Sequence, residues 1–155
     1  MSALNVGDTA PDFSLAAQDG TTVKLSELKG KPVVLIFYPM DRTPGCTKQL
    51  CAVRDDYDRY EKADIAVFGV NGGGAEAHRK FVSQYRLRTP LLVDTGLRVS
   101  SAYDAVAGFG PARMIKRTVV GVAPDGTVAY YRRGMPSTDE IIAAVTSSES
   151  TAAKA

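Results

Sequence analysis

The stretch "KPVVLIFYPMDRTPGCTKQLC", residues 31–51, joins two elements of the fold and holds both cysteines of the chain. Its first part, residues 31–39, is a continuous run of apolar and β-branched residues that ends at a proline, which is typical of a strand covered on both faces. Pro44 and Gly45 interrupt regular structure, so we expect a helix to begin close to Cys46. The stretch therefore predicts a buried strand followed by a helix that carries the two thiols.

Strands and helices alternate along the rest of the chain. Residues 10–28 predict a hairpin around Asp19-Gly20, and residues 48–63 carry apolar side chains every three or four positions, the pattern of an amphipathic helix. The other expected elements are a strand at residues 64–70, a helix at 75–85, a strand at 89–95, a short helix at 99–106, a hairpin at 117–134 and a last helix from Thr138. This order indicates an α/β domain with a central mixed sheet flanked by helices and an N-terminal hairpin. We expect one domain over residues 1–146 and a flexible tail over residues 147–155.

Composition limits the function. A chain of 155 residues with 45% hydrophobic residues fits one globular domain. The net charge is +2 and the basic residues are scattered, which argues against a nucleic-acid partner. The longest apolar runs are too short to span a bilayer, and "MSALNVGDTAPDF" has no targeting pattern. We therefore expect a cytoplasmic protein, in which a close pair of cysteines is more often redox-active or metal-binding than structural.

Cys46 is the candidate nucleophile. A thiol in the first turn of a helix meets unpaired backbone N–H groups and the positive end of the helix dipole, and both favour the reactive thiolate. The neighbouring cations Arg42 and Lys48 act in the same direction. The alternative is a buried core cysteine, since Cys46 shares a helix face with Leu50 and Val53.

Cys51 lies five positions after Cys46. If both residues are helical, their Cα atoms are about 8–9 Å apart on nearly opposite faces of the helix. A disulfide needs about 4.4–6.8 Å, so the bond requires the first helical turn to unwind. If the helix begins only after Cys51, the bond forms without movement. The spacing favours a redox switch over a static disulfide.

Other sites are weaker. The two cysteines and the single histidine, His78, do not complete a four-ligand zinc site without carboxylates. We interpret His78 as a helix residue with a local hydrogen bond rather than as a catalytic base. The run "NGGGAEAH", residues 71–78, lacks the spacing of a phosphate-binding loop and is interpreted as a flexible turn.

The segment "FYPMDRTPGCTKQLCAVRD" closely resembles the active-site segment of the peroxiredoxins, whose pattern is Pro, three residues, Thr, two residues, Cys. Here these residues are Pro39, Thr43 and Cys46. With its second cysteine five positions later, the segment resembles the atypical two-cysteine branch of the family, known as bacterioferritin-comigratory-protein or Q-type. The segments "VGDTAPDFSLAAQDG", "HRKFVSQYRL" and "RTVVGVAPDG" resemble the opening, the middle helix and the arginine-bearing strand of the family.

The resemblance implies a thioredoxin-like fold and an antioxidant peroxidase that reduces hydrogen peroxide and organic hydroperoxides. Cys46 would be the peroxidatic cysteine, and Cys51 would resolve its sulfenic acid as an intramolecular disulfide. Thr43 would hydrogen-bond the thiolate and the substrate oxygen, and Pro39 would shield the sulfur from water. Arg117 would stabilise the thiolate and the polarised peroxide.

The resemblance also implies thioredoxin or a similar dithiol as reductant, and a monomer or weak homodimer. It implies no metal, flavin or haem cofactor, and the short apolar runs argue against a membrane partner. Two other functions fit the cysteine pair. A thiol-based redox sensor without significant turnover would have nearly the same sequence. A thiol–disulfide oxidoreductase usually has the spacing Cys-x-x-Cys, which this chain lacks.

Overall fold

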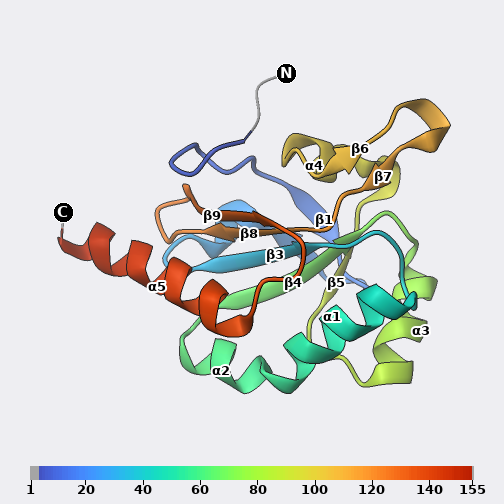
Figure 1. The fold of residues 1–155 in the computed structure, drawn as a ribbon, viewed down its shortest axis with the longest axis horizontal. Coiled ribbons are helices and arrows are strands. Elements are labelled where there is room, and N and C mark those ends of the chain that lie inside the picture. The colour runs from blue at the N-terminus through green and yellow to red at the C-terminus, as the bar shows by residue number, and fades with distance from the viewer. Residues whose placement is uncertain (1–3, 155) are drawn as a thin grey trace.

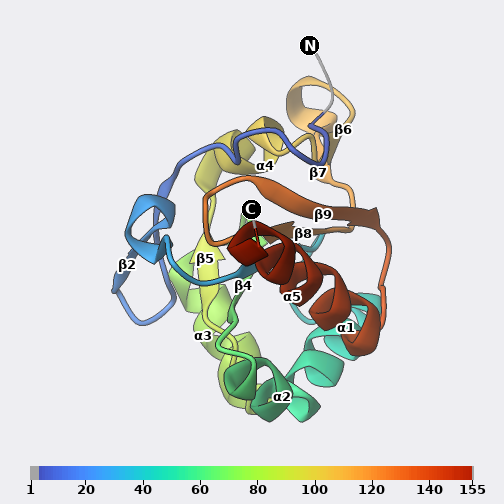
Figure 2. The same ribbon diagram turned by 90° about the vertical axis from the view of Figure 1, so that its left-hand side faces the viewer.

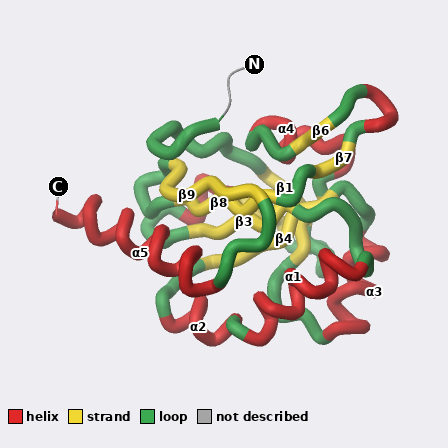
Figure 3. The backbone as a smooth tube through the Cα atoms, viewed as in Figure 1, coloured by secondary structure: helices red, strands yellow, loops and turns green. Residues whose placement is uncertain are grey.

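A five-stranded mixed sheet forms the centre of the protein, which we describe from a computed structural model covering residues 4–154, with backbone alone for 147–154. The strands follow the order β5-β4-β3-β8-β9. They are β3 (Val33–Phe37), β4 (Ala66–Asn71), β5 (Leu91–Val93), β8 (Thr118–Val122) and β9 (Val128–Arg133). β3, β4 and β5 run parallel to one another, whereas β8 is antiparallel to both β3 and β9. The predicted mixed sheet is confirmed (Figure 3).

Two small hairpins lie outside this sheet. β1 (Ser14–Ala16) pairs with β2 (Thr22–Lys24) around the predicted Asp19-Gly20 turn, which confirms the N-terminal hairpin. β6 (Val106–Ala107) pairs with β7 (Met114–Ile115) and leads the chain into β8.

The described part of the chain contains five α-helices and three short 3-10 helices. The α-helices are α1 (Pro44–Asp55), α2 (Tyr57–Lys62), α3 (Ala75–Tyr85), α4 (Arg98–Ala102) and α5 (Thr138–Lys154). The 3-10 helices are η1 (Leu25–Leu28), η2 (Thr95–Leu97) and η3 (Gly110–Ala112). Among residues 4–154, no helix combines the length and the hydropathy that a membrane span needs.

The helix predicted over residues 48–63 is two helices, which is a correction. It begins at Pro44, in agreement with the expected start close to Cys46, but it breaks at Asp56 between α1 and α2. The carboxylate of Asp56 accepts a hydrogen bond of 2.5 Å from the hydroxyl of Thr138 at the start of α5. The break thus coincides with a tertiary contact that helical periodicity does not reveal.

The last helix is longer than the sequence indicates. α5 continues to Lys154 and so includes residues 147–154, which the sequence predicts as a tail; Ala155 lies outside the described residues. The division into a domain of residues 1–146 and a tail of residues 147–155 stays a prediction. At the start of α5, the N–H of Glu140 donates to Ser137 Oγ, whereas the Glu140 carboxylate binds Tyr130 and Arg132 on β9.

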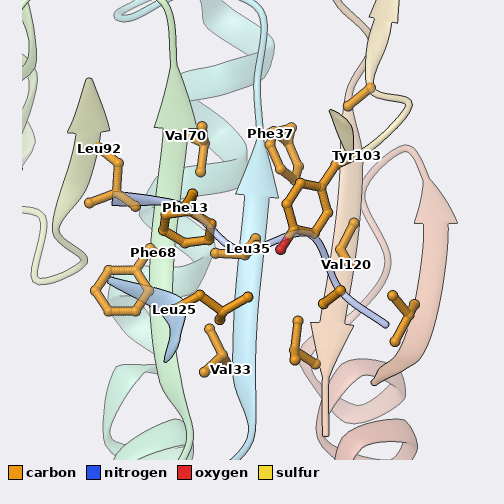
Figure 4. Close-up of a cluster of buried hydrophobic side chains, with 14 of the residues drawn as sticks. Phe13, Leu25, Val33, Leu35, Phe37, Phe68, Val70, Leu92, Tyr103 and Val120 are labelled. Atoms are coloured by element: carbon orange, nitrogen blue, oxygen red, sulfur yellow. The ribbon is translucent and has the colours of Figure 1, made fainter. Parts of the chain in front are cut away.

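The core consists of two layers separated by β3, whose residues are all buried. Val34 and Ile36 face the layer covered by α1, α2, α3 and α5, while Leu35 and Phe37 face the other layer. That second layer includes Phe13 from the N-terminal segment and Tyr103 next to α4 (Figure 4). Figures 1 and 2 show α4 and α5 on opposite sides of the sheet. The predicted strand covered on both faces is confirmed.

Candidate active site at the start of α1

Cys46 is the third residue of α1 and is completely buried. The chain leaves β3 at Phe37 and enters α1 at Pro44, whose fixed φ and missing N–H suit the first helical position. The sulfur therefore lies at the end of the helix where backbone N–H groups lack helical partners and the helix dipole is positive. Both features favour an anionic sulfur. The expected helix start close to Cys46 is confirmed.

Arg117 is the cation at this sulfur. Its Nη2 lies 3.4 Å from Cys46 Sγ, and its Nη1 donates to Gln49 Oε1 at 2.8 Å. Arg117 immediately precedes β8, and the antiparallel pairing of Thr118 with Phe37 brings this start of β8 beside the end of β3. The structure thus brings Cys46 and Arg117 together, as the resemblance implies.

Gly45 makes room for the guanidinium. A Cβ atom at this position would lie 3.1 Å from Arg117 Nη2, which is tighter than an ordinary contact. Glycine therefore permits the close approach of Arg117 to the first turn of α1.

Cys51 also belongs to α1, so both cysteines are helical. Both cysteines are free, with Cys46 buried and Cys51 partly buried. Helical geometry places their Cα atoms about 8–9 Å apart, beyond the reach of a disulfide. A bond between them requires part of α1 to unwind.

Thr43 and Pro39 flank the site, but their predicted roles stay predictions. Thr43 is the N-cap residue of α1, and its hydroxyl donates to the carbonyl oxygen of Met40 at 2.9 Å. That bond uses the one proton of the hydroxyl and leaves Oγ1 as an acceptor. Pro39 is partly buried, and its carbonyl oxygen accepts a hydrogen bond of 2.8 Å from the Asn71 side chain.

The side chain of His78 is not hydrogen-bonded locally, which corrects our interpretation. Its Nδ1 lies 2.6 Å from Asp41 Oδ2 and its Nε2 lies 3.1 Å from the carbonyl oxygen of Leu92. These partners are 37 and 14 positions away in the chain. The side chain bonds the loop before Cys46 rather than the sulfur itself.

Tyr38 is another buried side chain with a polar group near the site, and its hydroxyl donates to Asp41 Oδ1 at 2.6 Å. Burial, followed by the charges of Asp41 and Cys46, raises the pKa of Tyr38 well above its ordinary value. The Tyr38 hydroxyl therefore keeps its proton and acts as a donor.

Sequence reasoning missed Gln49 and Asp41. Gln49 follows Cys46 by three positions, a spacing that places two residues on one helix face. The position of Gln49 beside Cys46 could therefore be predicted from the sequence. Asp41 lies in an irregular loop, and nothing in the local sequence connects it with His78. Within the described part of the chain, no group of three or more His, Cys, Asp and Glu residues is placed to hold a metal ion.

The protein has a thioredoxin-like α/β fold. A cysteine lies at the start of the helix after the central strand, and an arginine lies at its sulfur. This combination defines a class of thiol-redox proteins. The model of the AhpC/TSA family matches residues 6–131 of the chain. The chain belongs to this family.

Two plant proteins are similar in sequence. A chloroplastic peroxiredoxin Q from Triticum aestivum is 55% identical over 93 residues, which are 60% of this chain and 43% of that protein. A putative chloroplastic peroxiredoxin Q from Oryza sativa subsp. indica is 48% identical over 124 residues, 80% of this chain and 57% of the relative. The predicted Q-type resemblance is confirmed. The chain spans only about half the length of these curated relatives.

Two solved structures are similar in fold. The peroxidoxin BcpB from Mycobacterium tuberculosis superposes with a TM-score of 0.85 at 31% identity, covering 93% of this chain and 97% of that one. A bacterioferritin comigratory protein from Xanthomonas campestris gives a TM-score of 0.82 at 23% identity, covering 96% and 99%. The predicted thioredoxin-like fold is confirmed.

Proposed function

We propose that the protein is a thiol-dependent peroxidase that reduces hydrogen peroxide and organic hydroperoxides at Cys46. The observation that carries the proposal is the 3.4 Å contact between Arg117 Nη2 and Cys46 Sγ at the start of α1. A buried sulfur with a guanidinium and helix N–H groups around it is stabilised as a thiolate, and thiolate is the nucleophilic form.

In the first step, the Cys46 thiolate attacks the terminal oxygen of the hydroperoxide. A sulfur–oxygen bond forms, the O–O bond breaks, and the leaving oxygen takes a proton and departs as water or an alcohol. Arg117 and the N–H groups of the first turn stabilise the charge that develops on the two oxygens. Thr43 Oγ1, whose proton is donated to Met40, accepts the O–H of the incoming peroxide, and Pro39 shields the sulfur from water.

In the second step, the Cys46 sulfenic acid condenses with the Cys51 thiol to a disulfide and releases water. Because the two residues are too far apart within α1, the first turn must unwind before they meet. Terminal helical turns are the least stable part of a helix, so this opening has a low energetic cost.

In the third step, a dithiol reduces the disulfide by exchange and is itself oxidised to a disulfide. We assign thioredoxin or a similar dithiol protein to this role, and we expect a monomer or a weak homodimer. A cytoplasmic location stays part of the proposal; fractionation of cells that express the tagged protein tests it.

The similar proteins support this assignment. The two plant relatives are named peroxiredoxins, and the Xanthomonas structure was studied for its alkyl peroxide reduction activity. The M. tuberculosis structure, which resembles this chain over nearly its whole length, is named a peroxidoxin.

Peroxide consumption with a thioredoxin-recycling system tests the function. We expect turnover for the wild type, none for Cys46→Ser, and a single turnover that stops at sulfenic acid for Cys51→Ser. Ala52→Ser, an exposed substitution in the same helix, is the matched control and should behave as wild type. Turnover by Cys46→Ser at the wild-type rate would overturn the assignment.

The same assay separates the enzyme from a redox sensor. Because both cysteines lie in α1, a disulfide between them requires part of the helix to unwind. Such a conformational change on oxidation is the observation that favours a sensor. A wild-type protein that is oxidised stoichiometrically but is not recycled by any dithiol would be a sensor.

A further inference from the structure

A chain of buried hydrogen bonds connects the loop before Cys46 to α3 and β5. The Tyr38 hydroxyl donates to Asp41 Oδ1 at 2.6 Å, and Asp41 Oδ2 lies 2.6 Å from His78 Nδ1. On its far side, His78 Nε2 lies 3.1 Å from the carbonyl oxygen of Leu92. The His78 side chain is 0% exposed and that of Asp41 is 7% exposed. These contacts take no part in the reaction proposed above.

The hydrogen-bond partners of His78 fix how many protons the two contacts of its ring hold. The carbonyl oxygen of Leu92 only accepts, so His78 Nε2 must carry a proton and donate it. The contact between His78 Nδ1 and Asp41 Oδ2 then holds one further proton, whichever of the two atoms it is bonded to. Asp41 accepts from Tyr38 on its other oxygen, so each side of the carboxyl group has a partner.

The backbone next to Asp41 is strained. Arg42 has a φ of 62°, in the left-handed region that a residue with a large side chain rarely adopts. Such a conformation costs on the order of 1 kcal/mol or more and persists only where surrounding contacts hold it. Two side chains hold this loop. One is Asp41, through its contact with His78. The other is Asn71, whose amide donates to the carbonyl oxygens of Tyr38 and Pro39 at 2.7 and 2.8 Å.

The turn after β4 is shaped around the pair. Gly73 donates its N–H to Asn71 Oδ1 at 2.8 Å. A Cβ at Gly73 would lie 3.0 Å from Asn71 Oδ1, 3.5 Å from His78 Cε1 and 3.7 Å from Asp41 Oδ2. Gly73 therefore packs directly against the pair.

We propose that Asp41 and His78 are a positioning pair that holds the loop of residues 39–43 in the geometry required for the reaction of Cys46 with peroxide. The inference rests on the proposed function, because the loop carries Pro39 and Thr43. Neither member of the pair touches the sulfur; both act through the loop, which they tie to α3 and β5. Misplacement of a positioning group by about 1 Å can cost about 100-fold in rate.

Two substitutions of Asp41 separate anchoring from charge. Asp41→Ala removes both hydrogen bonds of the carboxyl group. Asp41→Asn retains both, because the amide oxygen accepts from Tyr38 and the amide N–H₂ donates to His78 Nδ1 of a neutral imidazole. We expect Asp41→Ala to react with hydrogen peroxide about 10- to 100-fold more slowly, and Asp41→Asn to stay within about threefold of its parent.

The parent is the Cys51→Ser protein, in which Cys46 is the only thiol and each molecule reacts once. The second-order rate constant is measured with hydrogen peroxide and, separately, with iodoacetamide, which needs the thiolate but not the geometry of a peroxide. Near-ultraviolet circular dichroism on the same samples confirms that each variant is folded. A loss of peroxide rate in a folded sample without a parallel loss of iodoacetamide rate is a loss of positioning.

His78 gives the second arm. His78→Leu removes both ring hydrogen bonds in a side chain of similar bulk, and we expect it to match Asp41→Ala within about threefold. If the two residues act as one unit, the double variant is no slower than either single variant. Glu76→Gln, which alters the exposed 3.7 Å ion pair with Lys80 on α3, is the control and should leave both rates unchanged.

Full peroxide reactivity in folded Asp41→Ala would overturn the proposal. So would an Asp41→Asn protein as slow as Asp41→Ala, because the charge and not the anchoring would then matter. Independent, additive losses from Asp41 and His78 would also contradict the pair. If the Cys51→Ser parent itself does not react with peroxide, the proposed function fails and this inference fails with it.

Discussion

Arg117 and Cys46 are 71 positions apart in the chain, yet Arg117 Nη2 lies 3.4 Å from the Cys46 sulfur. The contact arises because β8 runs antiparallel to β3, so the residue before β8 meets the helix that follows β3. Gln49 completes the arrangement by accepting a hydrogen bond from the other guanidinium nitrogen. The site therefore depends on strand pairing as much as on the motif around Cys46.

Replacement of Arg117 should slow the reaction with peroxide. Arg117→Lys keeps a positive charge but replaces the planar fork, whose two nitrogens contact the sulfur and Gln49 separately, with a single nitrogen. We expect the rate constant with hydrogen peroxide to fall about 100-fold, the usual effect of losing one charge-stabilising donor. Single-turnover kinetics of Cys51→Ser proteins measure it. Arg79→Lys, at an exposed position on α3, is the control, and equal rates for the two variants would contradict the role of Arg117.

Gly45→Ala should separate stability from activity. Alanine stabilises a helix by up to about 1 kcal/mol relative to glycine, so the free energy of unfolding should not decrease. The new Cβ would meet Arg117 Nη2 at 3.1 Å and displace it, which should slow the peroxide reaction about tenfold. Gly74→Ala is the matched control, because a Cβ there has no neighbour within 4 Å. An unchanged rate for Gly45→Ala would show that the close approach is unimportant.

Oxidation should unwind the start of α1. One equivalent of hydrogen peroxide should abolish the slow amide hydrogen exchange of residues 47–51, whose N–H groups bond within the helix in the reduced protein. Exchange in α3 should stay unchanged and serves as the internal control. A disulfide-bonded protein in which residues 47–51 remain protected would contradict the unwinding step.

Arg42→Gly should stabilise the protein. Glycine adopts the left-handed φ of 62° found at Arg42 without steric cost, so we expect the free energy of unfolding to rise by about 1 kcal/mol. Arg79→Gly, within α3, should lower it by about 1 kcal/mol because glycine is a poor helix former. Urea denaturation under reducing conditions measures both. A loss of stability in Arg42→Gly would show that the Arg42 side chain contributes more than the strain costs.

Stability should fall at high pH. Burial, with a smaller contribution from the charge of Asp12, raises the pKa of Tyr103 above the ordinary tyrosine value of 10.0. Above that value the unfolded chain loses the Tyr103 proton while the folded protein keeps it, so the free energy of unfolding decreases as the pH rises. Tyr103→Phe should lose about 1 kcal/mol at neutral pH with its hydrogen bond to the carbonyl oxygen of Pro11. Between about pH 9 and about pH 11, the free energy of unfolding of Tyr103→Phe should decrease less than that of the wild type. Urea denaturation across this range checks the slopes, and identical slopes would contradict the assignment.

Elements with strong local signals could be predicted from the sequence. The apolar run of β3, the spacing of α3 and the turn residues of both predicted hairpins are local patterns, and the structure has each element within a few residues. The position of Cys46 in the first turn of α1 follows from Pro44 and Gly45 in the same way.

Features that depend on contacts between distant segments could not be derived locally. Arg117 was identified only through the family resemblance, because its role depends on the pairing of β8 with β3. The break at Asp56 coincides with a contact to Thr138, 82 positions later. His78 was interpreted as locally bonded, whereas its partner Asp41 lies on a loop that only the folded chain brings to α3.

Peptide mapping by mass spectrometry, after reduced wild-type protein reacts with one equivalent of hydrogen peroxide, tests the central claim most directly. The account predicts that both thiols disappear together and that Cys46 and Cys51 of the same chain are cross-linked. In Cys51→Ser, a sulfenic acid should be trapped at Cys46. Thiols that survive the peroxide, or oxidation of Cys51 while Cys46 stays reduced, would contradict it.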